Sequence, residues 1–292
     1  MTHPITVGVD GSPESRAAAA WAGREAVRRG VPLRVMSAWH WPPHGMLDGA
    51  GPDRDDQARW AREMVRDVAR KVADAHPDLP VSDEVVVGPA VDTLVAEAAG
   101  ARALVLGSRG HGAVVGFLLG SVGQQVIAEA GCPVVLVRAD DRAAPEAAGR
   151  EIVVGQQGEP EDSAAALEFA FETAAVRGAG VRAVRAWSLP PVFAYSPGSL
   201  RLLDEAGGLE PYETKALAEA LRPWRDRFPG VPVTPHVEMG SAGQVLLEQT
   251  AGAQLIVVGR RAHRSALGSR IGSVAHAVIH HAPCPVAVVP HS

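Results

Sequence analysis

Two stretches that read alike decide the fold: GSVGQQVIAEAGCPVVLV at residues 120–137 and GSVAHAVIHHAPCPVAVV at residues 272–289. Within each stretch an amphipathic run is followed by Cys-Pro and a β-branched run, the pattern of a helix that leads into a strand. Gly107/Gly259, Gly120/Gly272 and Cys132/Cys284 are each separated by 152 positions. A match in constant register indicates an internal duplication, so each half of the chain is one copy of the same fold.

Both halves alternate short β-branched runs with longer Ala-rich amphipathic runs. The predicted strands are 5–9, 33–39, 82–87, 103–107 and 133–137, then 152–155, 181–187, 232–238, 255–259 and 285–289. The helices predicted between the strands of the first half are 13–29, 55–75, 90–100 and 121–130. Pro13 and Pro160 stand where a first helical residue is expected. The alternation predicts an α/β fold, with a parallel sheet in each half, covered by helices on both faces and doubly wound by right-handed crossovers.

The length of 292 residues fits two domains of about 150 residues each. Residues 139–150, ADDRAAPEAAGR, have the composition of a linker. We therefore predict domains at residues 1–138 and 151–292. At Trp39/Trp187 the separation falls to 148, so the second half carries an insertion near residues 188–230. The segments 41–54 and 189–209 are rich in Pro and Gly and are predicted to be loops.

Charge and composition exclude several classes of protein. The chain has 28 Lys and Arg against 33 Asp and Glu, a net charge of −5, and neither half is basic, which argues against a nucleic-acid partner. No apolar run of about 18 residues predicts a membrane span, and the start lacks a signal-peptide pattern, so we expect a cytoplasmic protein. The two cysteines make neither a disulfide framework nor a cysteine zinc site, and we expect both to be buried.

A run of glycines follows the fourth predicted strand of the first half. ALVLG at 103–107 continues as SRGHGAVVGFLLGS, and Ser121 then opens a helix. Glycines let backbone N–H groups approach a ligand, and a helix N-terminus favours an anion, so the segment suits phosphate. A turn-rich loop with a serine cap explains the glycines equally well. The segment is neither a Walker A loop nor a dinucleotide fingerprint.

The spacing Gly107-x2-Gly110-x9-Gly120-Ser121 resembles the nucleotide loop of the universal stress protein family. The opening strand ITVGVD, which ends in Asp10, is also similar to that family. The likeness covers nearly the whole chain as two tandem copies, the form common in actinobacteria. It implies a Rossmann-like, five-stranded parallel sheet in each half, of the adenine nucleotide alpha hydrolase-like type. It also implies ATP as the ligand, with Mg an open question.

The resemblance assigns a role to each matching residue. Asp10 faces the adenosine end, Ala38 lines the adenine site, and the loop glycines wrap the ribose and the α-phosphate. Gly120, Ser121 and the amide of Val122 hold the outer phosphates. The residues implied in the first half are Gly8, Asp10, Ala38, Gly107, Ser108, Arg109, Gly110, His111, Gly112, Gly120, Ser121 and Val122.

The second half departs from the family pattern. The residues kept there are Gly155, Gly259, Gly272, Ser273 and Val274, and Arg260, together with Arg261 and Arg264, adds positive charge. Ala262 replaces the second loop glycine and Gln157 replaces Asp10. Alanine at a left-handed position costs about 1–2 kcal/mol, and a neutral amide makes weaker hydrogen bonds than a carboxylate. Whether the second half binds a nucleotide is left open by the sequence.

Three hypotheses for the function follow. The first is an ATP-binding stress-response or signalling module that acts on an unknown protein partner, as a homodimer or an internal pseudo-dimer. The second is an adenylyl- or phosphoryl-transferring enzyme or a slow ATPase, and the third is an interaction protein without a nucleotide. No lysine clamp and no carboxylate pair for magnesium are evident, so we assign no catalytic residue and no metal site. His111 and His263 are interpreted as surface loop residues.

Overall fold

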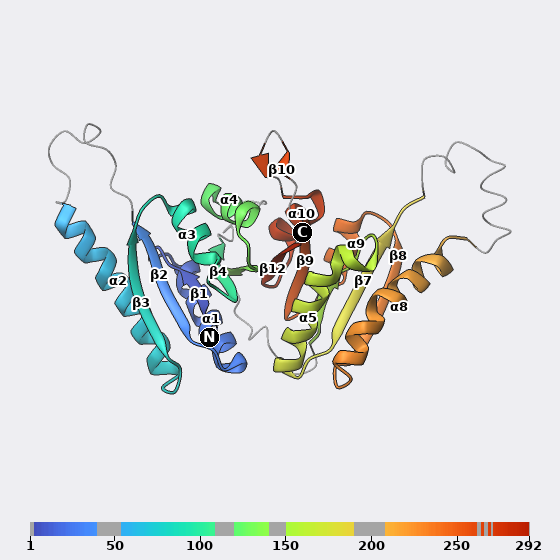
Figure 1. The fold of residues 1–292 in the computed structure, drawn as a ribbon, viewed down its shortest axis with the longest axis horizontal. Coiled ribbons are helices and arrows are strands. Elements are labelled where there is room, and N and C mark those ends of the chain that lie inside the picture. Colours follow the sequence, from blue (N-terminus) through green and yellow to red (C-terminus); the bar gives the residue numbers. More distant parts are fainter. Residues whose placement is uncertain are drawn as a thin grey trace. The chain divides into compact units, whose positions relative to one another are not determined.

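The computed structural model describes residues 3–39, 54–108, 120–139, 150–189, 208–261, 264–265, 268–269 and 271–291. The chain divides into two compact units, one built on residues 1–142 and the other on most of residues 143–292. Each unit is a twisted sheet flanked by helices (Figure 1). Most of the predicted linker, and both of the Pro- and Gly-rich predicted loops apart from their terminal residues, lie outside the described residues.

The first unit contains one five-stranded sheet in the order β3-β2-β1-β4-β5, and every neighbouring pair within it is parallel. Its strands are β1 (Ile5–Gly8), β2 (Leu33–Trp39), β3 (Val81–Val87), β4 (Ala103–Ser108) and β5 (Val134–Arg138). Its helices are α1 (Pro13–Arg29), α2 (Arg54–Ala75), α3 (Ala90–Ala98) and α4 (Ser121–Glu129). The predicted doubly wound α/β sheet is confirmed, and the element boundaries agree to within two residues.

The second unit repeats this arrangement in the order β8-β7-β6-β9-β12, again with parallel neighbours. Its strands are β6 (Ile152–Gly155), β7 (Val181–Trp187), β8 (Val233–Met239), β9 (Leu255–Arg261) and β12 (Val286–His291). Its helices are α5 (Ala164–Arg177), α8 (Glu210–Arg227), α9 (Ala242–Glu248) and α10 (Ser273–His281). The short strands β10 (Arg264–Ser265) and β11 (Gly268–Ser269) were not predicted.

Local signals explain where the first helix of each unit begins. Ser12 caps α1, because its hydroxyl accepts a hydrogen bond from the Ser15 amide at 3.1 Å, and Pro13 follows as the first helical residue. The second unit has one residue more here, and Pro160–Ser163 form a 3-10 turn before α5 begins. A capping box between Glu159 and Asp162 holds that turn. The helix predicted from Pro160 therefore starts as a 3-10 helix.

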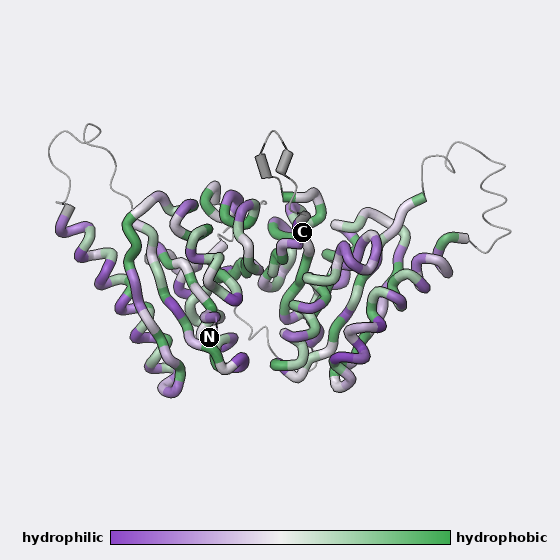
Figure 2. The backbone as a smooth tube through the Cα atoms, in the orientation of Figure 1, coloured by the Kyte–Doolittle hydropathy of each residue, from purple (hydrophilic) through white to green (hydrophobic). Residues whose placement is uncertain are grey.

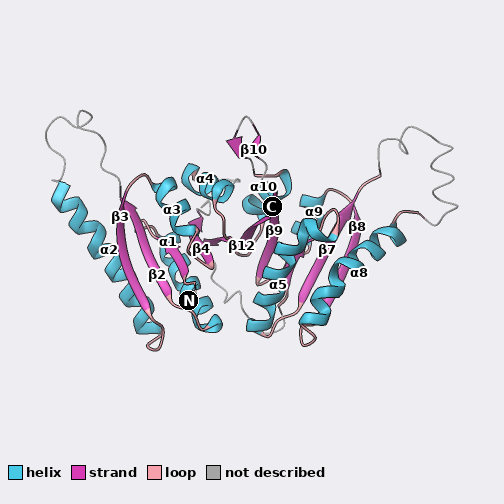
Figure 3. Ribbon diagram, viewed as in Figure 1, coloured by secondary structure: helices cyan, strands magenta, loops and turns pink. Residues whose placement is uncertain are grey.

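The core of each unit lies between the sheet and its two helical layers (Figure 3). In the first unit α1 packs on α2 and α3 packs on α4, and in the second α5 packs on α8 and α9 on α10. The central strands are almost completely buried, and Figure 2 shows hydrophobic residues, in green, on both the strands and the helices of each unit. Cys132 and Cys284 are buried as expected, and burial raises the pKa of the Cys132 thiol to about 11.

The two units fill one equivalent region of their cores differently. In the second unit Phe171 of α5 packs against Trp224 at 6.3 Å and Phe228 at 5.9 Å between ring centroids. The repeat counterparts of these three residues in the first unit are Gly23, Val72 and His76. A Cβ on Gly23 would lie 2.6 Å from Val72 Cγ1 and 3.3 Å from His76 Cδ2, so the smaller residues close the same space.

Candidate functional site

The candidate site lies at the carboxyl edge of the first sheet, where the strand order reverses. The chain runs from β1 outward to β2 and β3, then returns to place β4 on the other side of β1. Gly8 at the end of β1 pairs in register with Met36 of β2 and Leu106 of β4. Asp10, Ala38 and Gly107 lie one or two residues beyond these pairs. Open α/β sheets bind ligands at this switch point, so the fold brings these three predicted residues together.

Packing against backbone requires glycine at one predicted position, Gly107, and close packing against a leucine side chain favours glycine at Gly8. A Cβ on Gly107 would lie 2.6 Å from both the carbonyl carbon of Glu14 and the amide nitrogen of Ser15, because the end of β4 touches the start of α1. A Cβ on Gly8 would lie 2.8 Å from Leu106 Cδ2. Ser108 is buried, and its hydroxyl donates to the Val137 carbonyl at 3.3 Å, toward β5.

Asp10 is an exposed carboxylate held by the turn that precedes α1. Its Oδ1 accepts hydrogen bonds from the Ser12 amide at 3.0 Å and the Ser12 hydroxyl at 2.5 Å. Partial burial acts to raise the pKa of Asp10, but hydrogen bonds from Ser12, from Ser15 and from its own backbone outweigh it, so the pKa is lowered. The site therefore presents a fixed negative charge next to β1 at neutral pH.

We predict that Ser12→Ala lowers the free energy of unfolding by about 1 kcal/mol through loss of the helix cap. The same change raises the pKa of Asp10, because two hydrogen bonds to its charged form are weakened or lost. A lowered carboxyl pKa adds stability above the unfolded-state pKa and loses it as the pH falls through the folded-state value, so the variant loses less on acidification. Urea unfolding at pH 7 and pH 3 and carbon NMR titration of Asp10 measure both effects. Ser12→Thr, which keeps the hydroxyl, is the control; an unchanged Asp10 pKa in the alanine variant contradicts the argument.

The helix that follows the glycine segment begins without a side-chain cap. Gly120 is the cap residue of α4, with φ −59 and ψ 155, and, having no side chain, it makes no cap hydrogen bond to the first-turn amides. Gly120, Ser121 and Val122 are all exposed. α1, by contrast, has its cap satisfied by Ser12. The uncapped amides of α4 are therefore suited to bind an anion supplied from outside the chain.

Several of the predicted site residues fall outside the described parts of the chain. Arg109, Gly110, His111 and Gly112 lie outside the described residues, as do Ala262 and His263 of the second unit. Ala38, the second-last residue of β2, is half-buried. Within the part of the chain that the structure describes, no group of three or more His, Cys, Asp or Glu side chains is placed to hold a metal ion.

The second unit has the same strands and helix starts at the equivalent edge, but different side chains there. Gly272 caps α10 with φ −62 and no side-chain bond, Ser273 is exposed, and Val274 is half-exposed. Gly155 ends β6, Gly259 lies on β9, and a Cβ on Gly259 would meet only the His291 ring at 3.4 Å. Arg260 is 5 % exposed, and burial lowers its pKa. Gln157 replaces Asp10 and is exposed.

A hydrogen-bond network that the sequence did not predict holds the loop beside Gln157. Arg185 of β7 donates from Nη1 to Gln156 Oε1 at 2.5 Å and to the Gly158 carbonyl at 3.0 Å, and from Nε to Glu213 of α8 at 2.5 Å. Two of the partners lie in the loop after β6 and the third lies on α8, so only the folded chain shows them together. The first unit has Ser37 at the position equivalent to Arg185.

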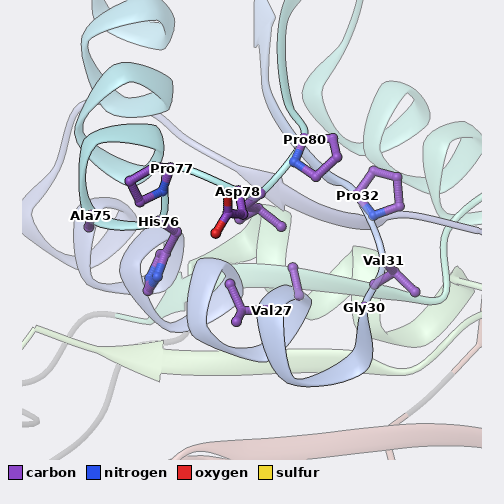
Figure 4. Close-up of a pocket in the computed structure, with 11 residues that line it drawn as sticks. Val27, Gly30, Val31, Pro32, Ala75, His76, Pro77, Asp78 and Pro80 are labelled. Carbon is purple, nitrogen blue, oxygen red and sulfur yellow. The ribbon is translucent and has the colours of Figure 1, made fainter.

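A cavity of about 570 Å³ lies at the opposite, amino-terminal edge of the first sheet (Figure 4). Val27, Val31, Pro32, Pro77 and Pro80 form much of its wall, together with His76 and Asp78. The carboxyl ends of α1 and α2 point to this edge, and helix carboxyl ends carry partial negative charge. With Asp78 in addition, the cavity is unsuited to phosphate, so it is not the predicted nucleotide site.

The fold and the site define a class of protein: a tandem α/β protein with, in each half, a glycine near the end of the fourth strand and a glycine as the cap residue of the helix that follows. The chain belongs to the universal stress protein family, whose model matches residues 1–138 and 149–290. It is 36 % identical to universal stress protein Rv2005c of Mycobacterium tuberculosis over 295 residues, which cover 99 % of this chain and 98 % of the relative.

A solved structure of the same length agrees with the fold. A universal stress protein from Archaeoglobus fulgidus DSM 4304 covers 100 % of both chains with a TM-score of 0.73 at 19 % identity. Another universal stress protein from Archaeoglobus fulgidus, solved in complex with dAMP, covers 47 % of this chain and 98 % of its own, with a TM-score of 0.36 and 25 % identity. No helix in the described parts of the chain is long and apolar enough to cross a membrane.

Proposed function

We propose that this protein is an ATP-binding stress-response module made of two domains, at residues 1–138 and 151–292. Its principal nucleotide site lies in the first domain. The observation that carries the proposal is the switch point itself. Asp10 and Gly107 lie beside it, and α4, the helix that follows β4 along the chain, begins with the exposed residues Gly120 and Ser121. A carboxylate on one side suits ribose hydroxyls or an adenine amino group, and a helix N-terminus on the other suits phosphate.

The second half is proposed to bind more weakly. It keeps the uncapped helix start at Gly272, but Gln157 supplies no charge for a charge-assisted hydrogen bond. The Arg185 network also fixes the loop beside Gln157, which reduces its freedom to adapt to a ligand. Neither half is assigned a catalytic residue.

Gly120→Asp is expected to weaken ATP binding at least tenfold without unfolding the protein. The backbone of Gly120 is at φ −59, and a Cβ there would meet nothing within 4 Å, so the residue tolerates a side chain. Aspartate is also a favoured helix cap, and its carboxylate occupies the amides and repels phosphate. Isothermal titration with ATP measures the loss, and nucleotide released on denaturing the purified protein gives the occupancy per chain.

Gly120→Asn is the matched control, because it caps the helix without the charge. Gly272→Asp makes the same change in the second half, where a Cβ also has open space. One nucleotide per chain, lost only in Gly120→Asp, supports the proposal. Two nucleotides show that both halves bind equally, and none, with no binding of added ATP, overturns the proposal in favour of a nucleotide-free interaction protein.

A further inference from the structure

Two large aromatic side chains are exposed at equivalent positions of the two units. Trp60 on α2 is 58 % exposed and Tyr212 on α8 is 66 % exposed. They are separated by the same 152 positions as the glycines of the repeat. An exposed aromatic ring at the same position in both copies indicates a surface that binds a ligand or a partner.

Trp60 lies against the loop that carries Asp10. A Cβ on Gly11 would lie 3.5 Å from Cη2 and 3.7 Å from Cζ2 of Trp60, and 3.5 Å from Cγ of Met64. Gly11 follows Asp10 directly and has φ +83, so the backbone there favours glycine and leaves room for the ring. One edge of the indole is therefore packed on the loop, while more than half of the side chain remains open to solvent beside the candidate site.

The second unit ties the start of α8, which bears Tyr212, to the equivalent loop by a different contact. Glu213, the next residue on α8, accepts a hydrogen bond from Arg185, and Arg185 donates to the Gly158 carbonyl at 3.0 Å. Gly158, with φ +73, is the counterpart of Gly11. In both units, then, the start of the helix that bears the aromatic is held against the glycine turn after the first strand.

We propose that Trp60 is the base-stacking residue of the first site, and that Tyr212 holds the corresponding place in the second. This inference rests on the proposed function, and it adds that the protein selects nucleotides over bare polyphosphate through a flat aromatic base. An indole offers a large, rigid apolar surface, and stacking of one base on an aromatic side chain strengthens binding by about 5- to 100-fold. Asp10, at the base of the same loop, orients the nucleotide by hydrogen bonding.

The test compares ATP with inorganic tripolyphosphate by isothermal titration, on the Gly272→Asp background so that the first site is measured. Trp60→Ala is expected to weaken ATP binding about 5- to 100-fold and to leave tripolyphosphate affinity unchanged. Trp60→Phe, which keeps an aromatic ring, is expected to retain most of the ATP affinity. In the parent protein ATP quenches indole fluorescence, and this quenching is lost in Trp60→Phe. Tyr212→Ala, an equally exposed change in the other unit, leaves the first site unaffected.

Each negative result leads to a different conclusion. If the parent binds ATP and Trp60→Ala binds it equally well, stacking is overturned and the proposed function stands. If Trp60→Ala weakens ATP and tripolyphosphate alike, Trp60 supports the loop and does not contact a base, which also overturns the inference. If the parent binds neither ligand, the proposed function and the inference fall together.

Discussion

Phe171→Ala is expected to lower the free energy of unfolding by about 3–5 kcal/mol, as large-to-small changes of buried aromatics do. Phe171 is 0 % exposed and packs between Trp224 and Phe228. Those rings are themselves held from outside, because the Arg227 guanidinium lies 5.1 Å from the centroid of Phe228 and pairs with Glu168. The rings therefore have little freedom to collapse into the space that the phenyl group leaves.

Urea unfolding of the full chain, followed by far-ultraviolet circular dichroism, measures this loss. Val176→Ala on the same helix is the control: Val176 is 39 % exposed, so its truncation changes stability by no more than about 0.5 kcal/mol. A loss below about 1 kcal/mol in Phe171→Ala shows that the second core repacks as the first unit does around Gly23. Nucleotide binding by the first half is expected to be unchanged.

The contrast between Phe171 and Gly23 shows what a sequence with one internal repeat can and cannot predict. The strands were predictable because each is a short β-branched run bounded by turn residues, and α1 because Ser12 and Pro13 mark its start. The exchange of Gly23, Val72 and His76 for three aromatics was not predictable. Gly23 lies on α1, while Val72 and His76 lie on or just after α2, about 50 positions later, and only the folded chain brings the three into contact.

The residues of the candidate site also differ in whether the sequence alone could predict them. Asp10, Gly107 and Gly120 follow from local motifs, since each stands at the end of a strand or the start of a helix. Arg185 gave no signal, because it lies within a strand run and its three partners are distant in sequence. Trp60 and Tyr212 did leave a signal, an aromatic at the same repeat position. Its meaning depended on their exposure and on the contact of Trp60 with Gly11.

Gly107→Ala is expected to destabilise the protein by about 1–3 kcal/mol and to weaken nucleotide binding as well. The added Cβ would lie 2.6 Å from two backbone atoms of α1, at Glu14 and Ser15, and no side-chain rotation relieves a clash with backbone. α1 must move away from β4, and its first turn carries the Ser12 cap that also fixes Asp10. One methyl group at Gly107 therefore disturbs both the end of β4 and the position of Asp10.

The repeat supplies a control of the same chemistry at the equivalent position. Gly259→Ala adds the same methyl group, but its Cβ would meet only the His291 ring at 3.4 Å, an ordinary contact distance. Neither glycine has a positive φ, so backbone strain contributes to neither variant. Thermal unfolding and ATP titration of the two variants are expected to differ, with Gly259→Ala within about 0.5 kcal/mol of the parent. Equal losses in both would mean that the close approach of β4 to α1 does not set the requirement for glycine, and that the glycine serves the loop that follows it.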